Sequence, residues 1–271
     1  MANQQFPLVS VLFVTYKRYD MLEMSVRTFC ENTSYPNLEL VIADDGSEPE
    51  MQARMRTLPA DIFALASKNR GLGANNNNGI RHCSGKYILM IQDDWMCVGP
   101  SDYLHNSIAV LEANPHVGLI NFAAAPHPPD LHQRLSGSSE PCYVTPASYT
   151  GNPKREFLYS DQPHIQSRAA LEYVGPYKED RDMEVCEMDY NLRWENQDRF
   201  TTAVFPAYHH RAFVCADEAG SFRKTRFRYK VESALQPLKP ALQKLSPTFF
   251  QKCRSFVQWT LRKMERVGLV R

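Results

Sequence analysis

Short apolar runs alternate with stretches of helical register along the amino-terminal part of the chain. Four runs have the composition of short buried strands: Leu8–Tyr16, Leu38–Ala43, Ile62–Ala66 and Tyr87–Ile91. The segments between them are predicted to be helical at Met21–Cys30, Met51–Leu58 and Gly79–Cys83, the last ending a helix that starts among the asparagines. This alternation predicts an α/β fold with a doubly wound, mostly parallel sheet.

The pattern becomes less regular after Trp95. Helices are expected at Ser101–Asn114, with Ser101 or Asp102 as the N-cap, and at Met183–Trp194. Further strands are expected at Val117–Ala123, Phe157–Tyr159, His164–Ser167 and Thr202–Tyr208. The segment His127–Gly151 has little periodicity and exceeds the usual connection length, so it is either a functional loop or locally disordered.

Charge is distributed unevenly along the 271 residues, although the net charge is only +1. Residues 222–271 contain 13 Lys and Arg against 2 Asp and Glu, which leaves 18 against 28 for residues 1–221. We therefore expect an acidic domain, 1–221, and a basic carboxyl-terminal extension, 222–271. The near-neutral total argues against a nucleic-acid-binding protein.

Within the extension, the residue pattern of 248–267 predicts a basic amphipathic helix. Its apolar residues share one helical face, and Lys and Arg side chains lie on the flanks. Such a helix suits peripheral contact with an anionic membrane surface. Two alternatives stay open: the apolar face packs on the catalytic domain, or it forms a homodimer.

Cysteine usage and hydropathy indicate the compartment. The seven cysteines are odd in number, widely spaced and without a CxxC pair, which favours a reducing environment over disulfides or structural zinc. No window approaches the roughly 20 apolar residues of a membrane-spanning helix. We expect a cytoplasmic protein that either is free in solution or lies at the inner face of the membrane.

Paired carboxylates follow two of the predicted strands. Asp44 and Asp45 end the second strand, and Asp93 and Asp94 end the fourth. In a doubly wound sheet these ends meet at one edge, where ligands bind. Adjacent carboxylates repel each other unless a cation or a shared proton joins them, so a divalent ion that holds a phosphate is one explanation. Solvated surface turns are the other.

Phosphate-binding glycine motifs are absent. No GxGxxG follows the first strand and no GxxxxGK[ST] occurs in the chain, which weakens a Rossmann dehydrogenase and a P-loop phosphotransferase. A nucleotidyltransferase is also weakened, because no Gly-rich loop with a following Arg and Lys comes after the first strand. A diphosphate would then need a cation, which again points to Asp93 and Asp94.

The motifs VSVLFVTYKR, LVIADDGS, KNRGLGANNNNGI and GKYILMIQDDW, in this order, resemble the nucleotide-binding half of family-2 glycosyltransferases with the GT-A fold. The resemblance is close over residues 7–98 and looser over 170–211. It implies a nucleotide-binding half, 1–98, an acceptor half, 99–221, and a Mg²⁺ or Mn²⁺ ion. The implied reaction transfers a sugar from a nucleotide-sugar donor, usually with inversion.

The same resemblance assigns residues to the donor. Thr15 and Tyr16 would flank the base, Asp44 or Asp45 would hydrogen-bond it, and Asp45 is preferred for a uracil-type contact. The remaining nucleotide-binding candidates are Arg70, over the base or near the phosphates, Asn77, Gln92 and Asp93.

For the metal, Asp94 aligns with the last acid of the family's Asp-x-Asp motif. Gln92 replaces the first acid; an amide still hydrogen-bonds a ribose hydroxyl but is a poorer metal ligand. His210 is the candidate third ligand or a diphosphate donor, and the alternative is a histidine that merely satisfies local hydrogen bonds.

The base that deprotonates the acceptor is expected on the predicted helix Met183–Trp194. VCEMDYNLRW resembles the family's ED-x-D-L-x-x-R pattern, with Glu187 at the base position and Asp189 as the second candidate. Residues two apart on a helix point to different faces, so the two cannot serve equally. A solvated acidic helix face is the alternative.

We therefore expect a metal-dependent, inverting glycosyltransferase in polysaccharide or glycoconjugate biosynthesis. The expected donor is a UDP-sugar and the expected acceptor a glycan or a lipid-linked molecule. The alternative is a catalytically silent scaffold that binds a nucleotide sugar, because the Asp-x-Asp and Glu-Asp motifs are both altered.

Overall fold

The computed structural model describes residues 6–122, 133–144, 158–179, 182–208 and 211–216. The chain divides into two compact units, Met1–Cys215 and Ala216–Arg271, and of the second only Ala216 is described. The basic extension 222–271 and its helix 248–267 lie outside the described residues, so the division into domains stays a prediction.

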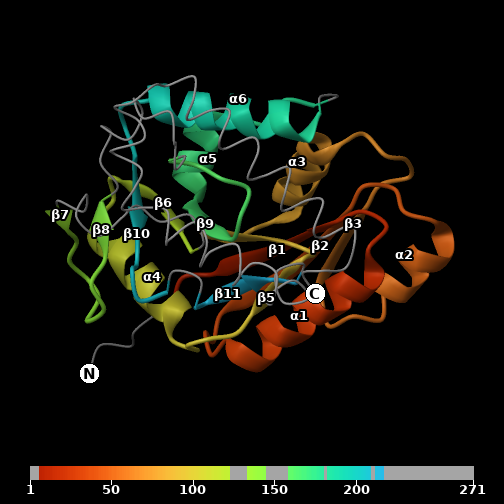
Figure 1. Ribbon diagram of the computed structural model, residues 1–271, viewed down its shortest axis with the longest axis horizontal. Helices are drawn as coiled ribbons and strands as arrows, with labels where there is room; N and C mark the ends of the chain where they lie inside the picture. Colours follow the sequence, from red (N-terminus) through yellow and green to blue (C-terminus); the bar gives the residue numbers. More distant parts are fainter. Residues whose placement is uncertain (1–5, 123–132, 145–157, 180–181, 209–210, 217–271) are drawn as a thin grey trace, which may run out of the picture. The chain divides into compact units, whose positions relative to one another are not determined.

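Six helices and eleven strands make up the described part of the chain (Figure 1). The helices are α1 (Tyr19–Asn32), α2 (Pro49–Met55), α3 (Leu72–His82), α4 (Tyr103–Ala113), α5 (Arg168–Val174) and α6 (Met183–Asn196). The strands are β1 (Val9–Thr15), β2 (Leu38–Asp44), β3 (Ile62–Leu65), β4 (Tyr87–Gln92), β5 (Trp95–Cys97), β6 (Val117–Asn121), β7 (Gln133–Arg134), β8 (Tyr143–Val144), β9 (His164–Ser167), β10 (Thr201–Val204) and β11 (Phe213–Cys215).

Nine strands form one mixed sheet in the order β3-β2-β1-β4-β9-β6-β10-β8-β7. Strands β1 to β4 are parallel, whereas β9 runs antiparallel to both of its neighbours, β4 and β6. Strand β10 is parallel to β6, and β8 is antiparallel to β10 and to β7. The prediction of a doubly wound, mostly parallel sheet is confirmed.

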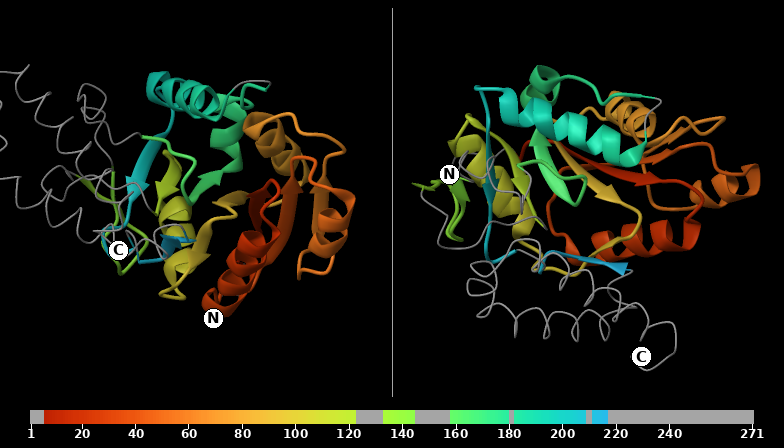
Figure 2. Two further views of the ribbon diagram at one scale, coloured as in Figure 1. Left: turned by 45° about the vertical axis from the view of Figure 1, so that its right-hand side comes forward. Right: turned by 45° about the horizontal axis from the view of Figure 1, so that its top comes forward.

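Helices cover both faces of this sheet (Figure 2). Strand β1 has every residue buried, and Val11 and Phe13 join one core cluster whereas Leu12 and Val14 join the other. The first cluster includes side chains of α1, α2 and α4, and the second includes side chains of α5 and α6. Alternate residues of a strand point to opposite faces, so the uninterrupted apolar run is explained by helices on both sides.

The structure corrects several expected elements. The predicted strand at Phe157–Tyr159 is wrong, because the described residues Leu158 and Tyr159 are not in a strand. The amide of Tyr159 instead donates to Oδ1 of Asn191 in α6, at 3.1 Å, so a helix side chain takes the place of a sheet partner.

Four short strands and one helix were not expected. Strands β7 and β8 lie within the segment predicted to be a loop, and β5 pairs with β11 in a separate small sheet. Strands of two or three residues carry too little periodicity to be recognised from sequence. Helix α5 follows β9 directly, with the Ser167 hydroxyl accepting a hydrogen bond from the amide of Ala170 as its N-cap.

Candidate functional site

The sheet order reverses between β1 and β4. From β1 the chain passes through α1 to β2 on one side, whereas β4 pairs with the other side of β1. Ligands of open α/β sheets bind outside the carboxyl ends of the strands at such a switch point. The register places Thr15 beside Asp44, and Val14 beside Gln92, so several predicted site residues share this edge.

Asp93 and Asp94 follow β4 at the switch point. The carboxylate of Asp93 is 5% exposed and accepts a hydrogen bond from the Thr15 hydroxyl at 2.7 Å. Burial raises the pKa of Asp93 to about 6, against the opposing effects of the Thr15 hydrogen bond and a nearby arginine. Thr15 and Asp93 are therefore brought together as predicted from their positions at two strand ends.

Arg18 joins the two carboxylates. Its Nη1 lies 3.0 Å from Oδ1 of Asp93 and 3.2 Å from Oδ2 of Asp94. We expected repulsion between these acids to be relieved by a metal ion, and the structure shows a guanidinium that does so. Arg18 lies in the polar break after β1, and its charge was the only sequence signal for this role.

One carboxylate oxygen of the acidic pair makes no hydrogen bond in the described part of the chain. Oδ1 of Asp94 is buried and has no hydrogen-bond partner among the described residues. A buried carboxylate oxygen in this condition suits a hard divalent cation, so Asp94 fits the predicted role of metal ligand. No group of three or more His, Cys, Asp or Glu side chains in the described ranges is arranged to hold a metal. The other predicted ligand, His210, lies outside those ranges.

The carboxylates after β2 make local contacts. Asp44 has no exposed surface, and its oxygens accept hydrogen bonds from the amide and hydroxyl of Ser47 and the side chain of Gln52. Asp45 accepts hydrogen bonds from the backbone amides of Arg70 and Gly71, each at 2.8 Å. Burial raises the pKa of Asp45 despite these two donors. Asp45 thus positions the segment that enters α3, and a contact with a base stays a prediction.

Asn77 and Arg70 both contact the segment before α6. The amide group of Asn77 donates to the carbonyl of Tyr177 at 2.8 Å and accepts from the Tyr177 amide at 2.9 Å. A third bond runs from Asn77 to Glu179 at 3.0 Å, and Arg70 pairs with the same carboxylate at 2.5 Å. Asn77 therefore fixes a loop to α3, and Glu179 was not recognised from the sequence.

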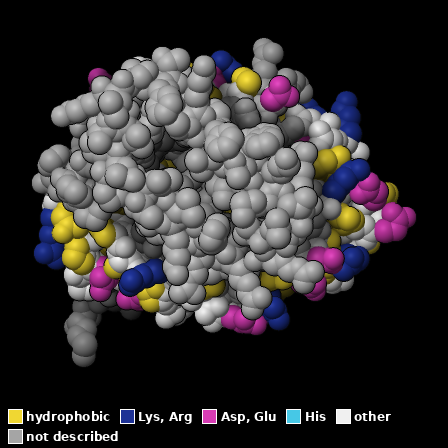
Figure 3. Space-filling model, viewed as in Figure 1, with side chains coloured by type: hydrophobic (Ala, Val, Ile, Leu, Met, Phe, Trp, Pro, Cys, Tyr) yellow, Lys and Arg dark blue, Asp and Glu magenta, His cyan; other side chains and the backbone are white. Residues whose placement is uncertain are grey.

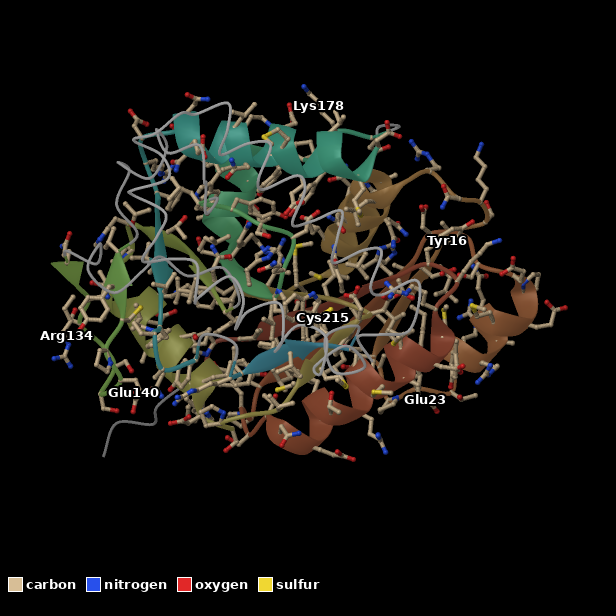
Figure 4. The ribbon with its side chains drawn as sticks, in the orientation of Figure 1. Tyr16, Glu23, Arg134, Glu140, Lys178 and Cys215 are labelled. Atoms are coloured by element: carbon tan, nitrogen blue, oxygen red, sulfur yellow. The ribbon has the colours of Figure 1, made fainter. Side chains whose placement is uncertain are left out.

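Tyr16 is the most accessible of the predicted base contacts near β1. Tyr16 is 37% exposed. It lies just after β1 and is labelled in Figure 4. The Lys17 ammonium is 5.3 Å from the centre of its ring and pairs with Glu48 at 2.6 Å. An exposed aromatic ring beside a cation has the surface needed to stack on a nucleotide base.

Glu187 and Asp189 have different partners on α6. Oε1 of Glu187 accepts from the Ser160 hydroxyl at 3.0 Å and from the Asp161 amide at 2.9 Å. Asp189 instead pairs with Lys178 at 2.5 Å and with Arg193 at 2.9 Å. Lys178 is labelled beside α6 in Figure 4. These two cations keep the pKa of Asp189 low despite the opposing effect of burial, which is the largest.

The two halves of the site approach each other through α3 and α6. A Cβ atom added to Gly73 would lie 2.0 Å from the Lys178 carbonyl oxygen and 2.9 Å from Sγ of Cys186. Cys186 precedes Glu187, and Gly73 lies in the first turn of the helix that Asp45 and Arg70 lead into. The predicted base is therefore on a helix packed against the start of α3.

Comparison with known proteins identifies the family. Residues 10–143 match the family described as Glycosyl transferase family 2, and this range includes the acidic pair and the Arg18 bridge. The chain contains a domain of this family.

Two characterised relatives match shorter stretches. The GalNAc(5)-diNAcBac-PP-undecaprenol beta-1,3-glucosyltransferase of Campylobacter jejuni is 27% identical over 93 residues, 32% of this chain and 30% of the relative. The human Beta-1,4 N-acetylgalactosaminyltransferase 1 is 31% identical over 111 residues, 40% of this chain and 19% of the relative. The chain thus spans under a third of the length of either relative.

Two solved structures share the fold. The mannosyltransferase PcManGT of Pyrobaculum calidifontis, in complex with GDP-Man and Mn²⁺, superposes with a TM-score of 0.54 at 18% identity, over 75% of this chain and 55% of that one. TarS 1–349 of S. aureus, in complex with UDP-GlcNAc, gives 0.50 at 15% identity, over 72% and 55%. The predicted GT-A fold is confirmed.

Four residues that contact candidate site residues were not recognised from the sequence: Arg18, Ser160, Asp161 and Glu179. Arg18 and Glu179 occur in charged segments of the sequence that match no recognised motif. Ser160 and Asp161 lie 27 and 26 residues before Glu187, and nothing in their spacing signals the contact.

No helix in the described ranges is both long and apolar enough to cross a membrane.

Proposed function

We propose that this protein transfers a sugar from a nucleoside diphosphate donor to an acceptor hydroxyl, with a divalent cation and with inversion. The observation that carries the proposal is the acidic pair at the switch point. It lies in the segment that matches the family, and a buried oxygen of Asp94 lacks a partner among the described residues.

The donor is proposed to bind across the carboxyl ends of β1, β2 and β4. Tyr16 and Arg70 have exposed side chains suited to a base and a diphosphate, while Asp45 orients the backbone at Arg70. We keep a UDP-sugar as the expected donor. The neighbours bind GDP-Man and UDP-GlcNAc, so both nucleotides belong in the first experiment.

A Mg²⁺ or Mn²⁺ ion fits at Asp94, with Asp93 beside it and His210 as the proposed further ligand. When bound, such an ion neutralises charge on the departing diphosphate. The Mn²⁺ of the archaeal mannosyltransferase supports this choice. Arg18 already carries one positive charge at the same carboxylates, so it either shares or yields that position.

Glu187 is proposed as the base, in preference to Asp189. Both oxygens of Asp189 pair with a cation, whereas the bonds to Glu187 all use Oε1 in the described part of the chain. The Glu187 carboxylate takes the proton of the acceptor hydroxyl while the oxygen of that hydroxyl bonds to the anomeric carbon. The bond from that carbon to the diphosphate breaks, and its electron pair leaves with the nucleoside diphosphate.

The acceptor is proposed to be a glycan or a lipid-linked molecule. The name of the bacterial relative includes an undecaprenol diphosphate, which supports the second choice. A lipid-linked acceptor would place the enzyme at the cytoplasmic face of a membrane, with the basic extension 222–271 as the proposed contact.

Donor binding and donor hydrolysis test the proposal together. A thermal-shift screen of UDP- and GDP-sugars with Mn²⁺ should raise the melting temperature for at least one of them, because a ligand of the native state stabilises it. That donor should be hydrolysed slowly by the wild type.

Glu187→Gln should retain donor binding and lose about 10²–10⁴-fold in turnover, the usual contribution of a general base. Glu195→Gln, on the same helix, is the matched control and should keep full turnover. Unchanged turnover in Glu187→Gln would assign the base elsewhere. Donor binding without any turnover in the wild type would instead indicate the silent scaffold.

A further inference from the structure

Glu187 is held by one oxygen only. The Ser160 hydroxyl and the Asp161 amide both donate to Oε1, at 3.0 Å and 2.9 Å. No donor in the described ranges bonds Oε2 of the same carboxylate. Two donors on one oxygen fix the rotation of a carboxylate and leave its second oxygen for another proton.

The donors come from a buried and specific segment. Ser160 is 7% exposed and Asp161 is 8% exposed, and both precede β9. The Tyr159 hydroxyl donates to Oδ1 of Asp161 and lies 2.6 Å from the Tyr177 hydroxyl. The Tyr177 ring stacks on Tyr190 of α6 with 4.1 Å between centroids. The segment is therefore locked to the helix that carries Glu187.

Asp161 is an unusual choice for this position. Its Oδ2 is buried without a hydrogen-bond partner among the described residues, a costly arrangement for a residue with a purely structural role. Burial raises the pKa of Asp161 to about 7, and the charge of Glu187 adds to the increase. A carboxyl that stays protonated up to about pH 7 can lie beside an ionised Glu187 with little repulsion.

We propose that Ser160 and Asp161 are positioning residues for the base: their two donors hold Oε1 of Glu187 and leave Oε2 to receive the proton of the acceptor. This inference depends on the proposed role of Glu187. Donors to a carboxylate also stabilise its charged form.

The other titratable side chains described near Glu187 are either ion-paired or uncharged near neutral pH. The carboxylate of Asp189 forms ion pairs with both Lys178 and Arg193. The remaining titratable groups packed around Glu187 and Asp161 are uncharged near neutral pH, because burial raises their pKa values: Tyr159, Tyr177, Tyr190 and Cys186. His164 is also uncharged there, since burial lowers its pKa to about 4.

Carbon NMR of protein labelled at the glutamate carboxyl carbons measures the pKa of Glu187 directly, with the signal assigned from Glu187→Gln. Ser160→Ala should raise this pKa by about 1 unit, because a hydrogen bond to a charged group is worth about that much. Ser160→Thr keeps the hydroxyl and should restore the wild-type value. Asp161→Asn keeps the backbone amide that donates to Glu187 and an oxygen for Tyr159, and should leave the pKa unchanged, because a carboxyl with a pKa of about 7 is uncharged in acid.

Ser138→Ala, which removes a part-buried serine hydroxyl bonded to Asn106 elsewhere in the fold, is the control and should leave the Glu187 titration unchanged. A raised pKa in Ser160→Ala that Ser160→Thr restores and Asp161→Asn does not reproduce supports the proposal. No shift in Ser160→Ala, or the same shift in Ser160→Thr, would overturn it. The titration needs no substrate, so its failure is distinguishable from retained turnover in Glu187→Gln, which would overturn the proposed function.

Discussion

A single guanidinium changes how the acidic pair at the carboxyl end of β4 is understood. Asp93 and Asp94 look like a metal site in sequence because nothing near them in the chain balances their charge. Arg18 does so from the start of another element, at 3.0 Å and 3.2 Å. A divalent cation that binds Asp94 must therefore compete with, or act beside, a positive charge already in place.

Replacement of Arg18 tests this competition. Arg18→Gln should bind Mn²⁺ more tightly than the wild type, by roughly 3–10-fold, because a positive charge close to the carboxylates is removed. Without metal the variant should be less stable by about 1–2 kcal/mol, since a largely buried carboxylate loses its partner. Calorimetric titration with Mn²⁺ and thermal unfolding in EDTA measure the two effects.

Arg54→Gln is the control for this variant, because Arg54 pairs with the exposed Asp20 and should affect neither quantity. Weaker Mn²⁺ binding by folded Arg18→Gln would show that Arg18 supports the cation instead of opposing it. Side chains of both signs lie at the right-hand edge of the face shown in Figure 3.

At the scale of elements, the asparagine-rich helix α3 organises the two halves of the site. Asn75 donates to the carbonyls of Thr15 and Ala43, and Asn77 holds the backbone of Tyr177. The helix was expected to start among the asparagines. The helix in fact begins before them, at Leu72, and their amides join the sheet to the loop that precedes α6.

Close packing at the start of α3 predicts a ranking of two glycine substitutions. Gly73→Ala would push a methyl group to 2.0 Å from the Lys178 carbonyl, whereas Gly79→Ala meets the side-chain tip of Leu12 at 2.4 Å. A side-chain tip yields more easily than backbone, so Gly73→Ala should cost more stability, about 2–3 kcal/mol. Urea unfolding of both variants measures the order. A Gly73→Ala variant as stable as Gly79→Ala would contradict the close approach of α3 and the loop before α6.

At the scale of the whole molecule, two buried groups make stability depend on pH in opposite directions. Asp161 has a folded pKa of about 7, above its ordinary value, so its contribution is complete in acid and is lost as pH rises toward 7. His164 has a folded pKa of about 4, below its ordinary value, so its contribution is lost as pH falls from about 6.5. The pH optimum of stability reflects both.

Asp161→Asn separates the two contributions. Between pH 5 and pH 8 the wild type should lose roughly 2–3 kcal/mol of unfolding free energy relative to the variant, because only the wild type must ionise a buried carboxyl. The effect of His164 is common to both proteins and cancels in the difference. Denaturant unfolding at several pH values provides the comparison, and a constant difference would show that Asp161 is already ionised at pH 5.

The sequence by itself determined the strand–helix alternation, the doubly wound sheet, and the placement of Asp44 and Asp93 at one edge of it. These follow from hydrophobic periodicity and from strand order, which depend on residues close together in the chain. The motifs also located Glu187 on α6, although its role stays a proposal.

Only the tertiary structure decided which groups the candidate residues contact. Arg18 meets residues 75 and 76 positions away, Asn77 meets a loop 100 positions away, and Ser160 meets Glu187 across 27. Side-chain partners of this kind depend on how helices pack across the sheet, and local patterns carry no record of it. The structure shows that Asp45 and Asn77 hold backbone, while their contacts with a ligand stay predictions, and that Arg18, Ser160 and Asp161 contact candidate site residues.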